Sequence, residues 1–167
     1  MTAYFLDTNV LVYAFAQDDP PKRGIARALA ESGEASISTQ VLSELANVLT
    51  RRLRFSPSET RGRVAGIAAS CELVLVTPSI VGDALRIMER YRYSFYDSQI
   101  LAAALAAGAK VLYSEDLQRE QIVDGTLTIR SPFRVTVQQR AARYAVKSRG
   151  RRRSRRSRNA AAAEGGT

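Results

Sequence analysis

The sequence places four acidic residues beside apolar segments, where a buried carboxylate is costly unless a positive charge compensates it. These residues are Asp7, Glu44, Asp97 and Asp116. Carboxylates that converge repel one another, and some of them would stay protonated without a counter-charge. Because a divalent cation relieves this repulsion, the pattern predicts that the four acids share one metal site.

The composition restricts the chemistry that such a site could use. The 167-residue chain contains one cysteine and no histidine, which excludes histidine general bases and argues against zinc. Ligands that offer only oxygen favour Mg²⁺ or Mn²⁺. Such an ion can activate a water molecule and neutralise charge on a phosphate during in-line displacement. No GxxxxGK[ST] or GxGxxG phosphate-binding loop is present.

Two of the acids are expected at the ends of buried strands. Residues 3–6 and 110–113 form short apolar runs that predict strands; Asp7 follows the first directly and Asp116 lies just past the second. In a parallel α/β sheet, ligands bind beyond the carboxyl ends of the strands, so both acids should stand at the binding rim. The alternative for each is a helix N-cap or a turn acid.

The other two acids are expected on the apolar faces of helices. At about 100° per residue, Glu44 falls at the border of the apolar stripe of a helix capped by Thr39. Asp97 shares a helix face with Ile100 and Ala104. The alternatives are an ordinary flanking acid for Glu44 and a first-turn acid stabilised by the helix dipole for Asp97. The four positions together favour one shared site over four separate structural roles.

The elements that would position these acids alternate along the chain. Strands are predicted at 3–6, 35–38, 72–76, 110–113 and 127–129, and helices at 10–16, 22–31, from 39, from 57, 77–90 and 96–107. This alternation favours an α/β fold with a parallel sheet covered on both faces.

The net charge of +9 lies entirely in the C-terminal segment. Residues 1–139 contain 15 basic and 15 acidic residues, whereas residues 140–167 contain 10 basic residues and one acid. We therefore expect one folded domain at 1–139 and a disordered basic tail at 140–167. The tail could pair with nucleic-acid phosphates. It could instead be a solvated extension without function, or fold back onto the acidic site when no nucleic acid is bound.

Three features predict a cytoplasmic protein without a membrane partner. No apolar run reaches the roughly 18 residues of a membrane span. The first residues contain no basic segment and reach an acid at Asp7, unlike a signal peptide. The single cysteine, Cys71, fits a reducing compartment.

Around its four acids the chain resembles the PIN-domain nucleases, in particular the VapC-type toxin ribonucleases of toxin–antitoxin pairs. The matching segments are 7–9 (Asp-Thr-Asn), 43–45 (Ser-Glu-Leu), 96–98 (Tyr-Asp-Ser) and 114–116 (Ser-Glu-Asp). Their order and spacing match over residues 4–134. The resemblance implies a three-layer α/β/α fold with a central parallel sheet.

The resemblance also implies a function, an endoribonuclease that depends on Mg²⁺ or Mn²⁺. The four acids would be catalytic and would hold one or two ions, while three polar residues would orient the acids or a water molecule: Thr8, Asn9 and Ser114. Glu115, which adjoins Asp116, is not expected to be a ligand. Toxins of this type dimerise and are silenced by an antitoxin, so the expected partners are an RNA substrate, a cognate antitoxin and a second copy of the chain.

The arginines are candidate contacts for RNA phosphates. The candidates are Arg51 and Arg52 at one helix end and the tail residues Arg151, Arg152 and Arg153, with solvated surface arginines as the alternative.

Two other functions stay open at this point. One is a catalytically inactive PIN-like RNA-binding module anchored by the tail. The other is an aspartyl-phosphate phosphotransferase that uses Asp7 as its nucleophile. Enzymes of the haloacid-dehalogenase type require a second aspartate two residues further on, where this chain has Asn9.

Overall fold

The structure is a computed structural model that describes residues 3–133. The tail predicted at 140–167, with its candidate RNA contacts Arg151, Arg152 and Arg153, lies outside the described residues.

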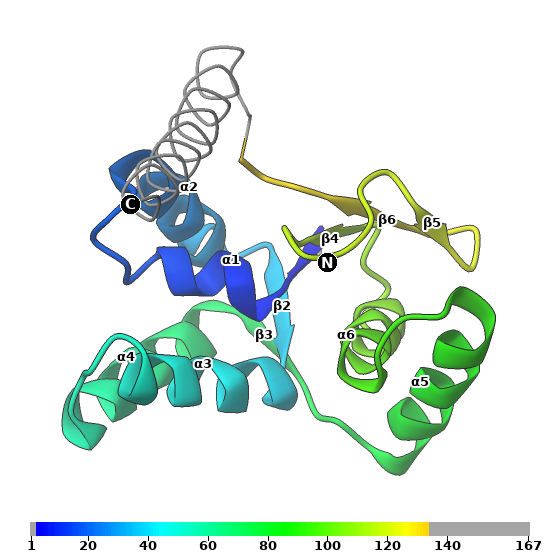
Figure 1. The fold of residues 1–167 in the computed structure, drawn as a ribbon, viewed down its shortest axis with the longest axis horizontal. Coiled ribbons are helices and arrows are strands. Elements are labelled where there is room, and N and C mark those ends of the chain that lie inside the picture. Colours follow the sequence, from blue (N-terminus) through cyan, green and yellow to red (C-terminus); the bar gives the residue numbers. More distant parts are fainter. Residues whose placement is uncertain (1–2, 134–167) are drawn as a thin grey trace, which may run out of the picture. The chain divides into compact units, whose positions relative to one another are not determined.

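A six-stranded sheet runs through the fold, in the order β3-β2-β1-β4-β6-β5 (Figure 1). The strands are β1 (Tyr4–Leu6), β2 (Ala35–Ser38), β3 (Glu72–Val74), β4 (Val111–Tyr113), β5 (Ile122–Val123) and β6 (Leu127–Arg130). All neighbouring strands pair in parallel except β5, which pairs antiparallel with β6. The predicted parallel sheet is confirmed for five strands, and the sheet is mixed because of this edge hairpin.

β5 was not predicted from the sequence, because the strand is too short to show an alternating pattern. It pairs with β6 across a turn at Asp124 and Gly125, whose φ angles of 48° and 72° are both positive. Two successive positive φ values suit a tight hairpin, and a glycine adopts one of them without steric cost.

Within residues 3–133, six helices flank the sheet (Figure 1). They are α1 (Thr8–Tyr13), α2 (Pro20–Glu31), α3 (Thr39–Arg51), α4 (Pro57–Ser70), α5 (Pro78–Tyr91) and α6 (Phe95–Ala106). Polar N-cap side chains begin them, and prolines occupy the first turns of α2, α4 and α5. The N-cap of α3 is Ser38 rather than the predicted Thr39, since the Ser38 side chain accepts from the Val41 N–H.

The two central strands, β1 and β4, have their carboxyl ends next to each other. Phe5, Leu6 and Leu112 are fully buried, as expected for strands covered on both faces. In the register of β1 and β4, Leu6 lies beside Tyr113. The residues that follow, Asp7 and Ser114, therefore leave the sheet at the same edge.

Among residues 3–133, no helix combines the length and apolarity that a membrane span requires.

Candidate active site

Asp7 stands at the junction of β1 and α1 with its carboxylate fully engaged. Its Oδ1 accepts from the Thr8 N–H at 2.6 Å. Its Oδ2 accepts from Ser114 Oγ at 2.7 Å and from Asn9 Nδ2 at 2.9 Å. Asp7 is also the N-cap of α1 and is only 5% exposed. The N-cap alternative is therefore true of Asp7, and it does not exclude a second role at the sheet edge.

Asn9 connects the two strand-end acids. Its Nδ2 lies 2.9 Å from Asp7 Oδ2 and 3.0 Å from Asp116 Oδ2, while its Oδ1 accepts from the Glu115 N–H at 3.2 Å. Ser114 Oγ, which donates to Asp7, accepts from the Asp116 N–H at 3.2 Å. One amide and one hydroxyl thus hold the loop after β4 against the start of α1.

Glu44 on α3 is held by two donors. Thr8 Oγ1 donates to Oε2 and Gln40 Nε2 donates to Oε1, both at 2.8 Å. Gln40 also donates to the Tyr96 carbonyl at 3.1 Å and accepts from Gln99 Nε2 at 2.7 Å, so it joins α3 to α6. The sequence analysis missed Gln40, although its position four residues before Glu44 could have indicated a neighbour on the same helix face.

Asp97 lies in the first turn of α6, where Ser94 is the N-cap. Its N–H donates to Ser94 Oγ at 3.2 Å, and its Oδ2 accepts from the same hydroxyl at 2.7 Å. The side chain is half-buried beside Ile100, and both residues line the same cavity. The dipole of α6 stabilises this carboxylate, while the cap fixes its direction.

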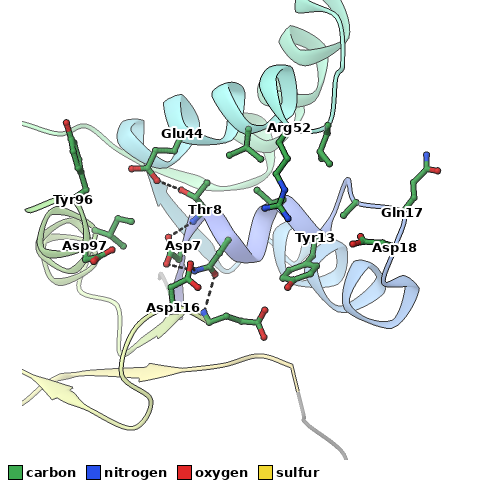
Figure 2. A pocket seen from close by; sticks show the side chains of 17 residues that line it. Asp7, Thr8, Tyr13, Gln17, Asp18, Glu44, Arg52, Tyr96, Asp97 and Asp116 are labelled. Atoms are coloured by element: carbon green, nitrogen blue, oxygen red, sulfur yellow. Dashed lines mark hydrogen bonds between the residues drawn. The ribbon is translucent and has the colours of Figure 1, made fainter. Parts of the chain in front are cut away.

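All four predicted acids line one open cavity of about 700 Å³ (Figure 2). They come from four separate segments: the end of β1, the middle of α3, the start of α6 and the loop after β4. Figure 2 shows Glu44, Asp7, Asp116 and Asp97 near one another, with Arg52, Tyr13 and Asp18 further along the cavity. The structure therefore brings together the set that was predicted from sequence.

The charge of this cavity is strongly unbalanced. Six carboxylates line it, and Arg52 is the one lining residue with a positive charge. One of the six, Glu115, is compensated by Lys22, which leaves five carboxylates against one arginine. Burial raises the pKa of Asp7 to about 6, because the hydrogen bonds from Ser114 and Thr8 offset the burial only partly and the charges of Glu44 and Asp116 add to it. The folded protein therefore binds a proton at Asp7 more readily than the unfolded chain does.

The two candidate arginines of α3 differ in position. Arg52, the C-cap of α3, lines the cavity, and within residues 3–133 its guanidinium forms no ion pair or hydrogen bond. Arg51, the last residue of α3, is exposed and does not line the cavity. Arg51 and Arg52, which the sequence did not distinguish, therefore differ in whether they reach the cavity.

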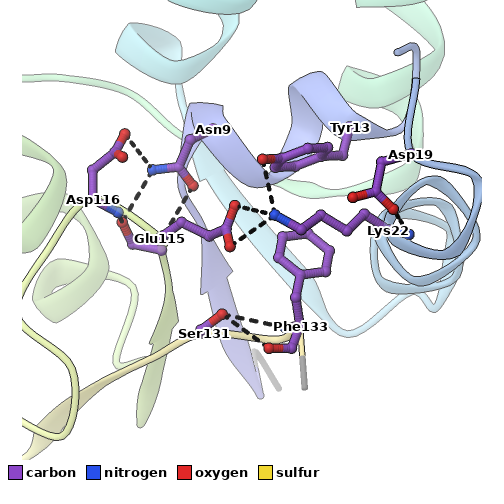
Figure 3. A network of polar contacts seen from close by, with 9 residues as sticks. Asn9, Tyr13, Asp19, Lys22, Glu115, Asp116, Ser131 and Phe133 are labelled. Atoms are coloured by element: carbon purple, nitrogen blue, oxygen red, sulfur yellow. Dashed lines mark hydrogen bonds and ion pairs between the residues drawn. The ribbon is translucent and has the colours of Figure 1, made fainter. Parts of the chain in front are cut away.

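Glu115 faces away from the other acids and is paired with a base. Its carboxylate forms an ion pair with Lys22 of α2, at 2.7 Å from Nζ (Figure 3). Lys22 was not identified in the sequence analysis, because nothing local links residue 22 to residue 115.

The donor set fits a hard divalent ion. Within residues 3–133, no three acidic or cysteine side chains already stand close enough to enclose a metal. The cavity nevertheless offers oxygen ligands from separate elements and is open enough to admit water. Mg²⁺ characteristically retains several waters and binds only one or two carboxylates directly, so a fully closed protein cage is not needed.

Comparison with known proteins identifies the family of this fold and site. Residues 4–123 match the PIN domain family, so the chain belongs to that family. A search of curated proteins gives no significant match.

Solved structures with similar folds include several toxins and their complexes. Mycobacterium tuberculosis VapC20, described as a sarcin-ricin loop cleaving toxin, is 23% identical, with a TM-score of 0.56 over 68% of this chain and 90% of that chain. DNA-bound VapBC from Salmonella typhimurium is 20% identical, with a TM-score of 0.61 over 80% and 100%. A toxin–antitoxin complex from Klebsiella pneumoniae is 18% identical, with a TM-score of 0.60 over 80% and 100%.

Proposed function

We propose that this chain is a metal-dependent endoribonuclease that hydrolyses RNA phosphodiester bonds, and that it is the toxin of a toxin–antitoxin pair. The observation that carries the proposal is the convergence of Asp7, Glu44, Asp97 and Asp116 on one open cavity. A binding module would have no need for such a set, since four carboxylates repel the phosphates of RNA unless cations neutralise them.

The four acids would hold Mg²⁺ or Mn²⁺, which when bound supplies a water of lowered pKa and neutralises charge that develops on the phosphate. The other residues hold the acids in place by hydrogen bonds. Thr8 and Gln40 fix Glu44, and Ser94 fixes Asp97. Asn9 and Ser114 hold Asp7 and Asp116 at one edge of the cavity. Carboxylates that are fixed before the ion arrives lose little conformational entropy on binding.

The partners belong to the same proposal. The Klebsiella and Salmonella structures are toxin–antitoxin complexes, which supports a cognate antitoxin for this chain. A homodimer is supported by apolar side chains on α5. Leu85 is 54% exposed, and Val81 and Met88 lie on the same exposed face, whereas Ile87 is in the core.

Removal of the metal should stop RNA cleavage. We expect purified protein to cut a cellular RNA mixture in Mg²⁺ or Mn²⁺, to stop in EDTA, and to resume when excess metal is returned. The readout is fragment formation on a denaturing gel, with circular dichroism to show that EDTA leaves the fold intact. Cutting that continues in EDTA would contradict the metal-dependent mechanism, and binding without cutting would support the inactive RNA-binding module.

Arg52 should bind an RNA phosphate next to the scissile one. We expect Arg52→Gln to raise KM for RNA by about tenfold or more, since a charge-assisted hydrogen bond contributes roughly 1.5–3 kcal/mol. Arg51→Gln is the matched control, because it removes the same charge from the adjacent residue outside the cavity. Equal changes in the two variants would show that only general electrostatic attraction is involved.

A further inference from the structure

The ammonium group of Lys22 is completely engaged beside the candidate active site. Nζ donates to Glu115 Oε1 at 2.9 Å, to Glu115 Oε2 at 2.7 Å and to Tyr13 Oη at 2.9 Å (Figure 3). It also lies 4.2 Å from the centroid of the Tyr13 ring and 4.8 Å from that of Phe133. An ammonium has three N–H donors, and here three oxygens accept them. Lys22 therefore has no donor left for an RNA phosphate.

The surroundings of this ion pair differ from those of an ordinary surface pair. The side chains of Lys22 and Glu115 are 13% and 17% exposed. The rings of Tyr13 and Phe133 meet edge to face at 5.0 Å and shield the ammonium. The burial restricts both side chains to one arrangement, and loss of either partner would leave the other charge poorly compensated.

A continuous chain of contacts leads from Lys22 to the predicted metal ligands. Glu115 is fixed through its carboxylate by Lys22 and through its backbone N–H by Asn9 Oδ1, at 3.2 Å. Asn9 Nδ2 in turn contacts Asp7 at 2.9 Å and Asp116 at 3.0 Å. Tyr13, which accepts from Lys22, lies one turn after Asn9 on α1.

We propose that Lys22 and Glu115 form a clamp that positions the loop 114–116, and with it Asp116 and Asn9, for metal binding. Both are positioning residues, because neither is expected to touch the metal or the RNA. The inference rests on the proposed function, since it assigns a role toward the metal. It explains why an acid next to Asp116 takes no part in the acidic cluster.

The clamp can be tested by metal binding alone, without a substrate. Replacing only Lys22 would leave an extra negative charge near the site, which by itself would tighten cation binding. The double variant Lys22→Met/Glu115→Gln removes the clamp without changing the net charge. We expect its dissociation constant for Mn²⁺, measured by titration calorimetry, to rise about tenfold or more, as is typical when partners of metal ligands are removed.

A second ion pair provides the matched control. Arg130→Met/Glu120→Gln removes the exposed pair between Arg130 and Glu120, which are 3.7 Å apart, and also preserves net charge. This control should bind Mn²⁺ as the wild type does. Lys22→Arg, which keeps the charge and can still reach Glu115, should keep most of the wild-type affinity for Mn²⁺, because it preserves the ion pair.

The possible outcomes distinguish failure of the clamp from failure of the proposed function on which it rests. If wild-type protein does not bind Mn²⁺, the proposed function fails. If wild type and the Lys22→Met/Glu115→Gln variant bind Mn²⁺ equally, the clamp is overturned and the function stands. Should the double variant not fold, Glu115→Asp decides the question, because it keeps the charge but shortens the reach to Lys22. Weaker Mn²⁺ binding by Glu115→Asp supports the clamp, and unchanged binding overturns it.

Discussion

Replacing Asp7 with asparagine should abolish RNA cleavage and leave the fold in place. Asp7 is the most buried of the four acids, and three hydrogen bonds fix its carboxylate at the edge of the cavity. An asparagine has nearly the same shape but loses the charge that a divalent ion requires. We expect kcat to fall on the order of 10³-fold or more, measured with a fluorogenic RNA in Mn²⁺.

The control for this variant is Asp83→Asn, which removes a half-exposed carboxylate from α5, outside the cavity. It should cut RNA at the wild-type rate. Cleavage by Asp7→Asn at more than about a tenth of the wild-type rate would contradict a role for Asp7 in holding the metal.

The same variant also tests the buried charge in the absence of metal. The pKa of Asp7 is about 6 in the folded protein against an ordinary value of 3.8. Because the pKa of Asp7 is higher in the folded protein, the Asp7 carboxyl contributes fully to stability below about pH 3.8. This contribution is lost as the pH rises through about 6. The linkage predicts that the free energy of unfolding falls by roughly 2 kcal/mol between about pH 4 and pH 7 from this group. Urea titrations in EDTA should show this fall in the free energy of unfolding for the wild type and not for Asp7→Asn.

Removing the side chain of Asn9 should also weaken cleavage strongly. Asn9 contacts both Asp7 and Asp116 and accepts from the Glu115 N–H, so Asn9→Ala frees the loop after β4 and leaves Asp7 with one donor fewer. We expect a loss of about 10- to 100-fold in Mn²⁺ affinity and in kcat/KM. Calorimetry and initial-rate kinetics give the two values separately.

An exposed asparagine on α3 provides the comparison for Asn9. Asn47→Ala removes a side chain that forms no hydrogen bond with the part of the chain that the structure describes, and its kcat/KM should equal that of wild type. Asn9→Asp adds a negative charge next to Asp7 and Asp116 and should raise the pKa of Asp7 further. If Asn9→Ala retained full metal affinity, Asn9 would not be needed to position the acids, and the strand ends alone would hold them.

The order of elements could be predicted because each core element shows its periodicity locally. The apolar run at 4–6 and the stripe on α3 are local patterns that burial imposes on the sequence. The short edge strand β5 could not be predicted, because two residues have no recognisable period. The cap of α3 was assigned one residue late, since serine and threonine at 38 and 39 are both good N-caps.

The convergence of the four acids on one cavity could be predicted because each is a charged residue at the edge of a core element. Their supporting contacts could be predicted only in part. Thr8, Asn9 and Ser114 lie within two residues of an acid, and the matching segments included them. Lys22 reaches Glu115 across 93 positions of the chain, a contact that follows from how α2 packs and leaves no pattern in one sequence.

The position of β1 in the sheet has a consequence for synthesis on the ribosome. β1 is made early, yet it lies between β2 and β4, and its neighbour β4 begins at Val111. The hydrogen bond between Asp7 and Ser114 spans 107 positions, so loop closure must precede it and contacts of this kind form late. A nascent chain that has emerged only as far as α5 lacks both Asp97 and Asp116. The site thus assembles only after nearly all of the described fold has left the ribosome, so a growing chain would lack the proposed nuclease activity toward the RNA that surrounds it.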